Sequence, residues 1–185
     1  MLFNSTDFLL FFPIVTLIYY ILPHRLRYLW LLGCSYYFYM CWNPKYNVLL
    51  LFSTIVTYFS GIFMEICKRS NLSVAYKTIA KKACVAGSLL LNLAPLGLFK
   101  YFNLFGSIFS HFLGVLHIDF TVPTFDLLLP VGISFYSFQA LSYTMDVYRN
   151  EIYAEKNFFK YALFVSFFPQ LVAGPIERSR NLLVQ

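Results

Sequence analysis

The segment LPVGISFYSFQALSYTMDVYRN, from Leu129 to Asn150, decides how this chain folds. It carries a glutamine, three tyrosines, an aspartate and an arginine, although 59% of the 185 residues in the chain are hydrophobic. Pro130 suits the first turn of a helix, because the backbone N–H that proline lacks has no partner there. The segment therefore predicts a helix over 131–148. The direction in which its polar side chains point indicates which side of this helix faces neighbouring protein.

The polar side chains of this segment fall on one helical face when it is projected at about 3.6 residues per turn. The residues on that line, with two tyrosines beside it, are Gly132, Gln139, Asp146, Asn150, Tyr136 and Tyr143. The opposite side holds Val131, Phe138, Leu141 and Met145. We therefore expect the polar face to turn away from lipid, toward neighbouring protein, because polar groups in a membrane need partners.

The composition of the chain indicates a membrane protein. Only 12% of the residues are charged, whereas a soluble domain has about 25%. So few charges do not cover a surface exposed to water, and the fold class predicted is an all-α, polytopic transmembrane protein in the cell membrane. The formal net charge of +6 comes from basic residues clustered between apolar runs. This clustering is typical of cytoplasmic loops in membrane proteins. Nucleic-acid binding is disfavoured, because the sequence has no basic stripe with interleaved aromatic residues apart from the apolar runs.

The apolar runs predict about five to seven membrane helices, including broken or re-entrant pieces. They cover residues 8–22, 28–42, 46–67, 83–99, 101–116, 131–148 and 158–172, with Lys100 dividing the fourth from the fifth. The stretch 68–82 holds five Lys and Arg residues and no acidic residue, which predicts a cytoplasmic loop. Together with Arg25 and Arg27 it places the N-terminus and residues 43–45 outside.

The sequence after residue 100 is compatible with two membrane topologies. If 101–116 crosses the membrane, the loop 117–129 is cytoplasmic, although it contains no Lys or Arg. If 101–116 lies in the interface or re-enters, 117–129 is outside and the loop with Arg149, Lys156 and Lys160 is inside. The positive-inside rule favours the second solution.

A second motif, FFPQLVAGPIER at residues 167–178, contains two prolines and a glycine that break a helix twice. Broken helices in membranes often frame sites, because the freed backbone groups need polar partners. The alternative is a plain helix end with Glu177 and Arg178 in water. The face at 131–150 has an alternative as well, namely an interfacial ion pair of Asp146 with Arg149 rather than a polar cavity.

The residues alone do not name a reaction. His24, His111 and His117 form no catalytic motif, and no spacing of the four cysteines with histidine predicts a metal site. From the pattern, the chain is a membrane protein with a polar inner face.

The two motifs at 129–149 and 167–178 together resemble the paired signature of the membrane-bound O-acyltransferases, and most of all the alginate O-acetylation branch. The segments MLFNSTDFLLFFPI, LLGCSYYFYMCWNPKY and LGLFKYFNLF fit this branch in the same order, so the resemblance covers essentially the whole chain. The resemblance implies a ring of helices around a funnel. It also implies transfer of an acyl group, expected to be acetyl, from acetyl-CoA or an acyl-carrier species to hydroxyls of an exported polysaccharide. Transfer of D-alanine to teichoic acid is the alternative within the family.

The resemblance also sets expectations for the site. The catalytic general base of the family is a histidine in a Trp-His motif that would lie beyond Gln185, so residues 1–185 are expected to be the N-terminal part of one transmembrane domain, inactive alone, with no catalytic residue. The residues expected to line the funnel are Gln139, Tyr143, Asp146, Arg149, Pro175 and Arg178. No bound cofactor or metal is expected. The expected partners are the lipid bilayer, an extracytoplasmic acyltransferase and the polysaccharide.

Two functions outside this family remain as alternatives. In a transport or channel subunit, the polar face at 132–150 would line a permeation path. In an inert scaffold, the chain would bind a partner helix.

Overall fold

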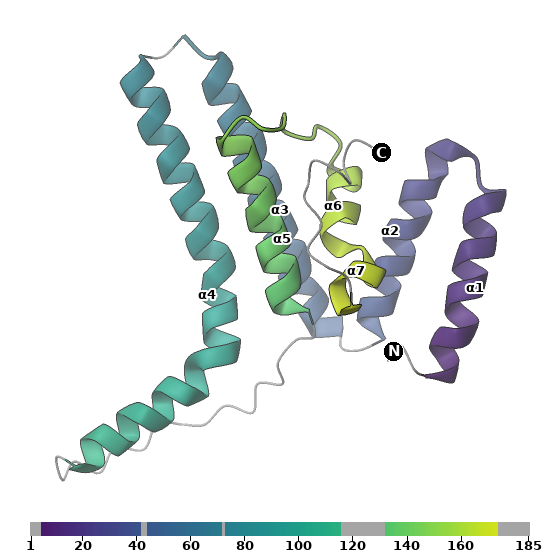
Figure 1. Ribbon diagram of the computed structural model, residues 1–185, viewed down its shortest axis with the longest axis horizontal. Helices are drawn as coiled ribbons and strands as arrows, with labels where there is room; N and C mark the ends of the chain where they lie inside the picture. The colour runs from purple at the N-terminus through teal and green to yellow at the C-terminus, as the bar shows by residue number, and fades with distance from the viewer. Residues whose placement is uncertain (1–4, 42–43, 72, 116–131, 174–185) are drawn as a thin grey trace.

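The computed structural model describes residues 5–41, 44–71, 73–115 and 132–173. Within these ranges the chain forms helices and no strand (Figure 1). The helices are α1 (Thr6–Ile21), α2 (His24–Met40), α3 (Pro44–Arg69), α4 (Val74–Val115), α5 (Ile133–Tyr148), α6 (Phe158–Ser166) and α7 (Phe168–Ala173). The predicted all-α class is therefore confirmed.

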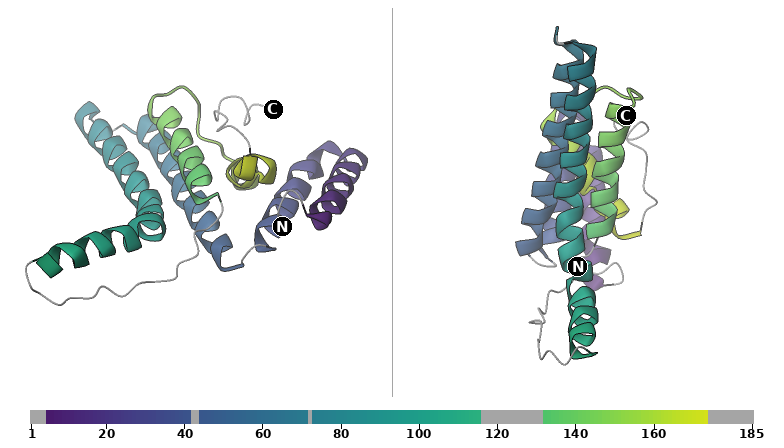
Figure 2. Two further views of the ribbon diagram at one scale, coloured as in Figure 1. Left: turned by 60° about the horizontal axis from the view of Figure 1, so that its bottom comes forward. Right: turned by 90° about the vertical axis from the view of Figure 1, so that its left-hand side faces the viewer.

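The helices form an elongated layer rather than a compact ball (Figures 1 and 2). Helix α3 packs along both α4 and α5, and α4 also contacts α5. Helices α6 and α7 lie between α5 and α2, and α1 covers the outer side of α2 (Figure 1). The broken pair α6–α7 is consequently enclosed by α2, α3 and α5, which places it in the interior of the layer.

Helix α4 corrects two predictions about the middle of the chain. It runs unbroken from Val74 to Val115, so Lys100 does not divide it into two pieces. It also begins only a few residues after α3 ends at Arg69, so most of the predicted loop 68–82 is helical. The physical reason is the same in both places: lysine interrupts an apolar run but is a good helix former. Pro95 lies inside α4, whose ribbon bends partway along its length (Figure 1), as proline in a helix predicts.

The starts of α1 and α5 follow local chemistry. Ser5 is the N-cap of α1, and its side chain accepts a hydrogen bond of 3.3 Å from the backbone N–H of Phe8. Gly132 precedes α5 with a φ of 77°, in the left-handed region that favours glycine. Gly132 therefore starts the helix and adds no side chain to its polar face.

The outer surface of the layer is apolar and its interior contains polar groups. Leu9, Leu17 and Tyr20 on α1 are 68%, 62% and 72% exposed, whereas Thr57 and Asn92 are buried inside. Two segments, Pro44–Arg69 and Val74–Leu98, are long and apolar enough to cross a membrane, and α1 is apolar but shorter. Because this distribution is the reverse of that in a soluble domain, it is that of an all-α membrane protein.

Candidate functional site

The polar face predicted for α5 turns into the protein. Tyr136, Gln139 and Tyr143 are 2%, 1% and 0% exposed, whereas Phe138 on the opposite side is 50% exposed. Leu141, which the helical projection places on the opposite side, is buried as well. The reason is that α4 packs against this side of α5, where the hydroxyls of Ser88 on α4 and Thr144, three residues after Leu141, lie 3.5 Å apart.

The break predicted at the second motif lies between α6 and α7. Phe167 leaves the helical conformation with a ψ of 108°, and α7 restarts at Phe168, immediately before Pro169. Pro169 has no N–H to continue the hydrogen-bond ladder of α6, whereas in the first turn of α7 the missing N–H needs no partner. The break frees the N–H of Phe168, which donates to Ser35 Oγ on α2 at 3.4 Å.

The carbonyl freed by the same break is bound by the polar face of α5. Gln139 Nε2 donates to the backbone oxygen of Phe164 at 2.7 Å, and to Gln170 Oε1 on α7 at 3.1 Å. In an unbroken helix the acceptor of the Phe168 N–H would be this same carbonyl. Gln139 therefore stabilises the broken backbone from outside the helix, as a break inside a membrane requires.

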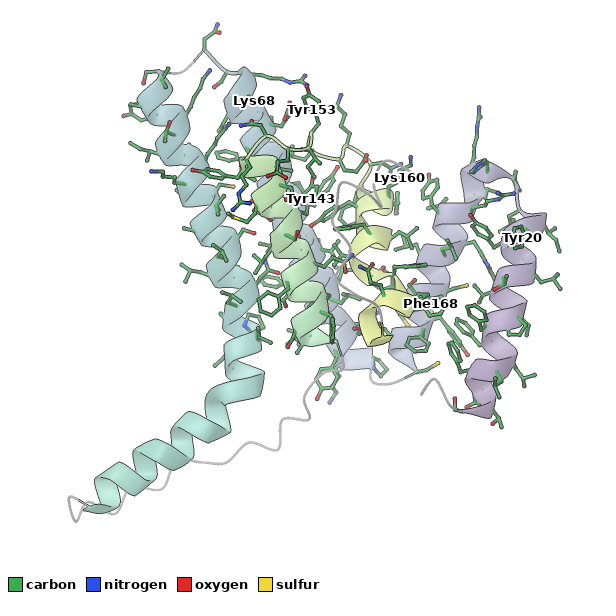
Figure 3. The ribbon with its side chains drawn as sticks, in the orientation of Figure 1. Tyr20, Lys68, Tyr143, Tyr153, Lys160 and Phe168 are labelled. Carbon is green, nitrogen blue, oxygen red and sulfur yellow. The ribbon has the colours of Figure 1, made fainter. Side chains whose placement is uncertain are left out.

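Tyr143 connects the polar face to the loop between α5 and α6 (Figure 3). Its Oη accepts a hydrogen bond of 3.0 Å from the backbone N–H of Glu155, and its ring centroid lies 4.4 Å from that of Tyr161. Tyr161 Oη in turn donates to Thr57 Oγ1 on α3 at 2.6 Å. These contacts hold α3, α5 and α6 at fixed positions, and they assign Tyr143 a structural role within the interior.

The other predicted funnel residues lie apart from this interior. Asp146 is half-buried and Arg149 is exposed, near the end of α5 that is farther from the break. Pro175 and Arg178 lie outside the described residues, as does the second break predicted at Gly174–Pro175. The structure thus brings Gln139 and Tyr143 together with the broken helix.

A seam of small and hydroxyl side chains on α3 was missed by the sequence analysis. Ser53, Thr57 and Gly61 recur every four residues, so they share one face of α3. The hydroxyl of Ser53 is hydrogen-bonded to the side chain of Asn92 on α4. This recurrence of small residues is the typical signal of close helix packing in membranes, and it could have identified the seam.

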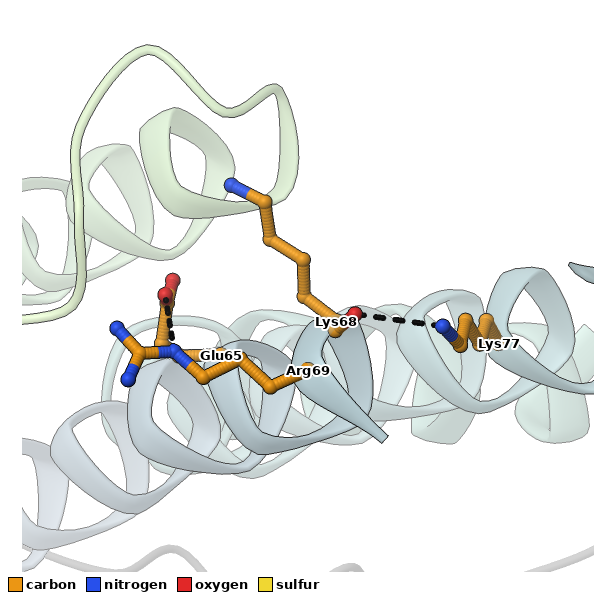
Figure 4. A network of polar contacts seen from close by, with 4 residues as sticks. All are labelled: Glu65, Lys68, Arg69 and Lys77. Atoms are coloured by element: carbon orange, nitrogen blue, oxygen red, sulfur yellow. Dashed lines mark hydrogen bonds and ion pairs between the residues drawn. The ribbon is translucent and has the colours of Figure 1, made fainter. Parts of the chain in front are cut away.

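Basic residues gather where α3 ends and α4 begins, beside the α5–α6 loop (Figure 4). Arg69 forms an ion pair of 3.3 Å with Glu65, and Lys77 Nζ donates to the backbone oxygen of Lys68 at 3.3 Å. Lys68 Nζ lies 5.3 Å from the ring centroid of Tyr153 in the loop, a cation–π contact (Figure 3). The turn after α3 and the loop before α6 are therefore joined at one end of the layer, which we call the basic end.

No group of three or more His, Cys, Asp or Glu side chains is placed to bind a metal ion within the part of the chain that the structure describes. The hydrogen bonds around the α6–α7 break are made by neutral amide and hydroxyl groups.

The fold and the site define a helical membrane protein with an apolar exterior and a hydrogen-bonded interior around a broken helix. Over its whole length the chain is 36% identical to a probable alginate O-acetylase of Azotobacter vinelandii and 38% identical to one of Pseudomonas putida. It is 33% identical over its whole length to a peptidoglycan O-acetyltransferase of Helicobacter pylori. The chain is therefore homologous to membrane-bound O-acyltransferases of the alginate O-acetylase type, which confirms the resemblance predicted from its motifs.

The chain corresponds to only part of each of these relatives. The chain covers 36%, 37% and 38% of the length of these three relatives, so it spans little more than a third of each. No family model matches the chain, and no solved structure matches it either.

Proposed function

We propose that this chain forms part of a membrane O-acyltransferase that transfers acetyl groups to hydroxyls of an exported polysaccharide. The observation that carries the proposal is similarity along the entire chain to relatives named for O-acetylation of alginate and of peptidoglycan. Both named acceptors are glycan polymers rich in hydroxyl groups. Because these relatives are named for acetyl transfer, acetyl is favoured over D-alanine as the group transferred.

The role we propose for the described residues is to maintain a polar path within an apolar layer. Attack by a sugar hydroxyl on an acyl carbon requires a group that takes the hydroxyl proton, and it requires lipid to be excluded from the reacting atoms. The contacts of Gln139 and Tyr143 keep α5, α6 and α7 in register around the break, and so support such a path. The acyl donor, acetyl-CoA or an acyl-carrier species, is a substrate and not a bound cofactor.

We propose that the basic end faces the cytoplasm. The cationic side chains that support this orientation lie near the ends of α3, α4, α5 and α6 and include Lys68, Arg69, Lys77, Lys81, Lys82, Arg149, Lys156 and Lys160. The start of α2, which carries Arg25 and Arg27, lies at the same end (Figure 1). Under the positive-inside rule, the N-terminus and the start of α5 are then outside, which agrees with the second topology predicted from the sequence.

This orientation assigns a side of the membrane to each substrate. The donor reaches the protein at the basic end, and the polysaccharide approaches the opposite end, where an extracytoplasmic acyltransferase partner completes the transfer. A multi-pass location in the cell membrane follows from the same orientation.

The proposed function is tested by deleting the gene that encodes this chain and measuring base-released acetate per unit of exported polysaccharide. We expect the acetate to fall, and to be restored by the wild-type gene and by the lipid-facing control Phe138→Leu. Unchanged acetate on a polymer produced in normal amount would reject the proposal. Flux of a small solute through vesicles that contain the protein and no acyl donor would instead support a transport subunit.

A further inference from the structure

Three buried polar side-chain atoms of the described residues have no hydrogen-bond partner in the structure: Asn47 Oδ1, Tyr136 Oη and Ser166 Oγ. These residues are 8%, 2% and 0% exposed. Nearly all buried polar groups in proteins are hydrogen-bonded, and lipid supplies no water to replace a missing partner. Buried groups of this kind are therefore candidates to bind a polar ligand.

All three groups lie on the side of the layer away from the basic end. Asn47 and Tyr136 lie near the starts of α3 and α5, and Ser166 is the last residue of α6. The starts of α3 and α5 lie at the end opposite the basic end, and α6 runs toward that end and stops short of it, where α7 begins (Figure 1). In the orientation proposed above, this end faces outward.

Tyr136 and Ser166, which carry the two hydroxyl groups, are both close in sequence to residues that form hydrogen bonds at the break. Tyr136 is three residues before Gln139, on the same face of α5. Ser166 is two residues after Phe164, whose carbonyl accepts the hydrogen bond from Gln139. The amide groups of Gln139 and Gln170, which are hydrogen-bonded to each other, therefore lie within the same region.

The chemistry of this region favours binding of an uncharged group of the ligand. A tyrosine or serine hydroxyl donates one hydrogen bond and accepts others, and the two glutamine amides carry no net charge. Lys45, the lysine near the start of α3, is exposed rather than turned into the interior. A sugar hydroxyl, which also donates and accepts, complements such a set better than a phosphate or a cation does.

We propose that Tyr136 and Ser166, beside the Gln139–Gln170 amide pair, bind hydroxyl groups of the saccharide acceptor. The identity of the ligand rests on the proposed function, whereas the position of the site rests on the two unpaired hydroxyls and the broken helix. The site binds and orients the acceptor and takes no part in proton transfer.

The test uses the full chain purified in detergent, with a mannuronate oligosaccharide titrated as the probe. We expect Tyr136→Phe and Ser166→Ala each to weaken binding roughly three- to tenfold, the loss of about one hydrogen bond. Neither substitution should lower the melting temperature, because each removes a buried hydroxyl that has no partner. The matched control is Tyr161→Phe, which removes a bonded hydroxyl; it should lower the melting temperature and leave the affinity unchanged.

The proposal is overturned if the wild-type chain does not bind the oligosaccharide, or if both site variants bind it as tightly as wild type. It is also overturned if Tyr136→Phe lowers the melting temperature as much as Tyr161→Phe without changing the affinity, since the hydroxyl would then be structural. Failure of this site is separable from failure of the proposed function. Loss of polysaccharide acetate on deletion of the gene, with unchanged oligosaccharide affinity in the variants, rejects the site alone.

Discussion

Gly61 on α3 and Tyr143 on α5 are packed so closely that no side chain fits between them. A Cβ atom on Gly61 would lie 2.8 Å from Tyr143 Oη and 2.9 Å from Tyr143 Cε1. Tyr143 is fully buried, and its Oη accepts the N–H of Glu155 from the α5–α6 loop. The absence of a side chain at position 61 therefore sets the distance between α3 and α5, as small residues do in membrane helix pairs.

We predict that Gly61→Ala displaces the Tyr143 ring and breaks its hydrogen bond to the loop. Overpacking of this kind costs about 1–3 kcal/mol of stability. The measurement is the thermal unfolding midpoint of the purified chain in detergent. Gly33→Ala on α2 is the matched control, because a Cβ there would meet no atom within 4 Å. Equal midpoints for the two variants would contradict the close packing of Gly61 on Tyr143.

A second prediction concerns the amide that stabilises the broken helix. Gln139→Leu removes both hydrogen bonds of Nε2 and leaves the Phe164 carbonyl buried without that donor. An unsatisfied buried acceptor costs about 1–3 kcal/mol, so we expect a clear drop in the unfolding midpoint. Phe138→Leu, one residue away on the exposed side, should change it little. A Gln139→Leu variant as stable as Phe138→Leu would show that the break does not depend on this amide.

The polar face of α5 was predictable because it depends on the spacing of residues within one helix only. Gln139 and Asp146 are seven residues apart, and this spacing defines a face without knowledge of any neighbour. The burial of Leu141 was not predictable in this way, because it depends on where α4 packs, and the periodicity of α5 contains no such information. The location of a break near Pro169 followed from local backbone chemistry. Its partners, Ser35 and Gln139, come from distant helices and could not be read from the motif.

The wrong prediction of a break at Lys100 and the missed seam on α3 have a different origin. Lys100 was interpreted through hydropathy, but the continuity of a helix depends on backbone propensity, which lysine satisfies. The seam at Ser53, Thr57 and Gly61 was missed although its four-residue spacing is visible in the sequence. Hydroxyl side chains reduce hydropathy only slightly, so a polar seam inside an apolar helix is found by spacing and not by composition.

A third prediction tests the contact between α3 and α6. Tyr161 Oη donates to Thr57 Oγ1 at 2.6 Å, and both residues are fully buried. We expect Tyr161→Phe and Thr57→Val each to destabilise the chain, with a coupling energy of about 1 kcal/mol in a double-mutant cycle. Unfolding midpoints of the four proteins in detergent provide the measurement. Strictly additive effects would mean that the two hydroxyls do not interact.

The last prediction concerns orientation, and the chain contains a natural probe for it. Cys41 is exposed at the end of α2, away from the basic end, whereas Cys34 and Cys67 are buried. If the basic end is cytoplasmic, a membrane-impermeant maleimide should label Cys41 in intact spheroplasts. The buried thiols should react only after denaturation, which provides an internal control.

The opposite side is probed by Lys82→Cys in a Cys41→Ser background, because Lys82 is exposed near the start of α4. This thiol should react with the impermeant reagent only after the membrane is permeabilised. The inverse pattern, with position 82 labelled in intact spheroplasts and Cys41 protected, would reverse the orientation. It would place the unpaired hydroxyls of Tyr136 and Ser166 on the cytoplasmic side, where an exported polysaccharide does not reach them. The labelling result therefore tests the topology and the accessibility of the acceptor site together, since both depend on which end of the layer carries the positive charge.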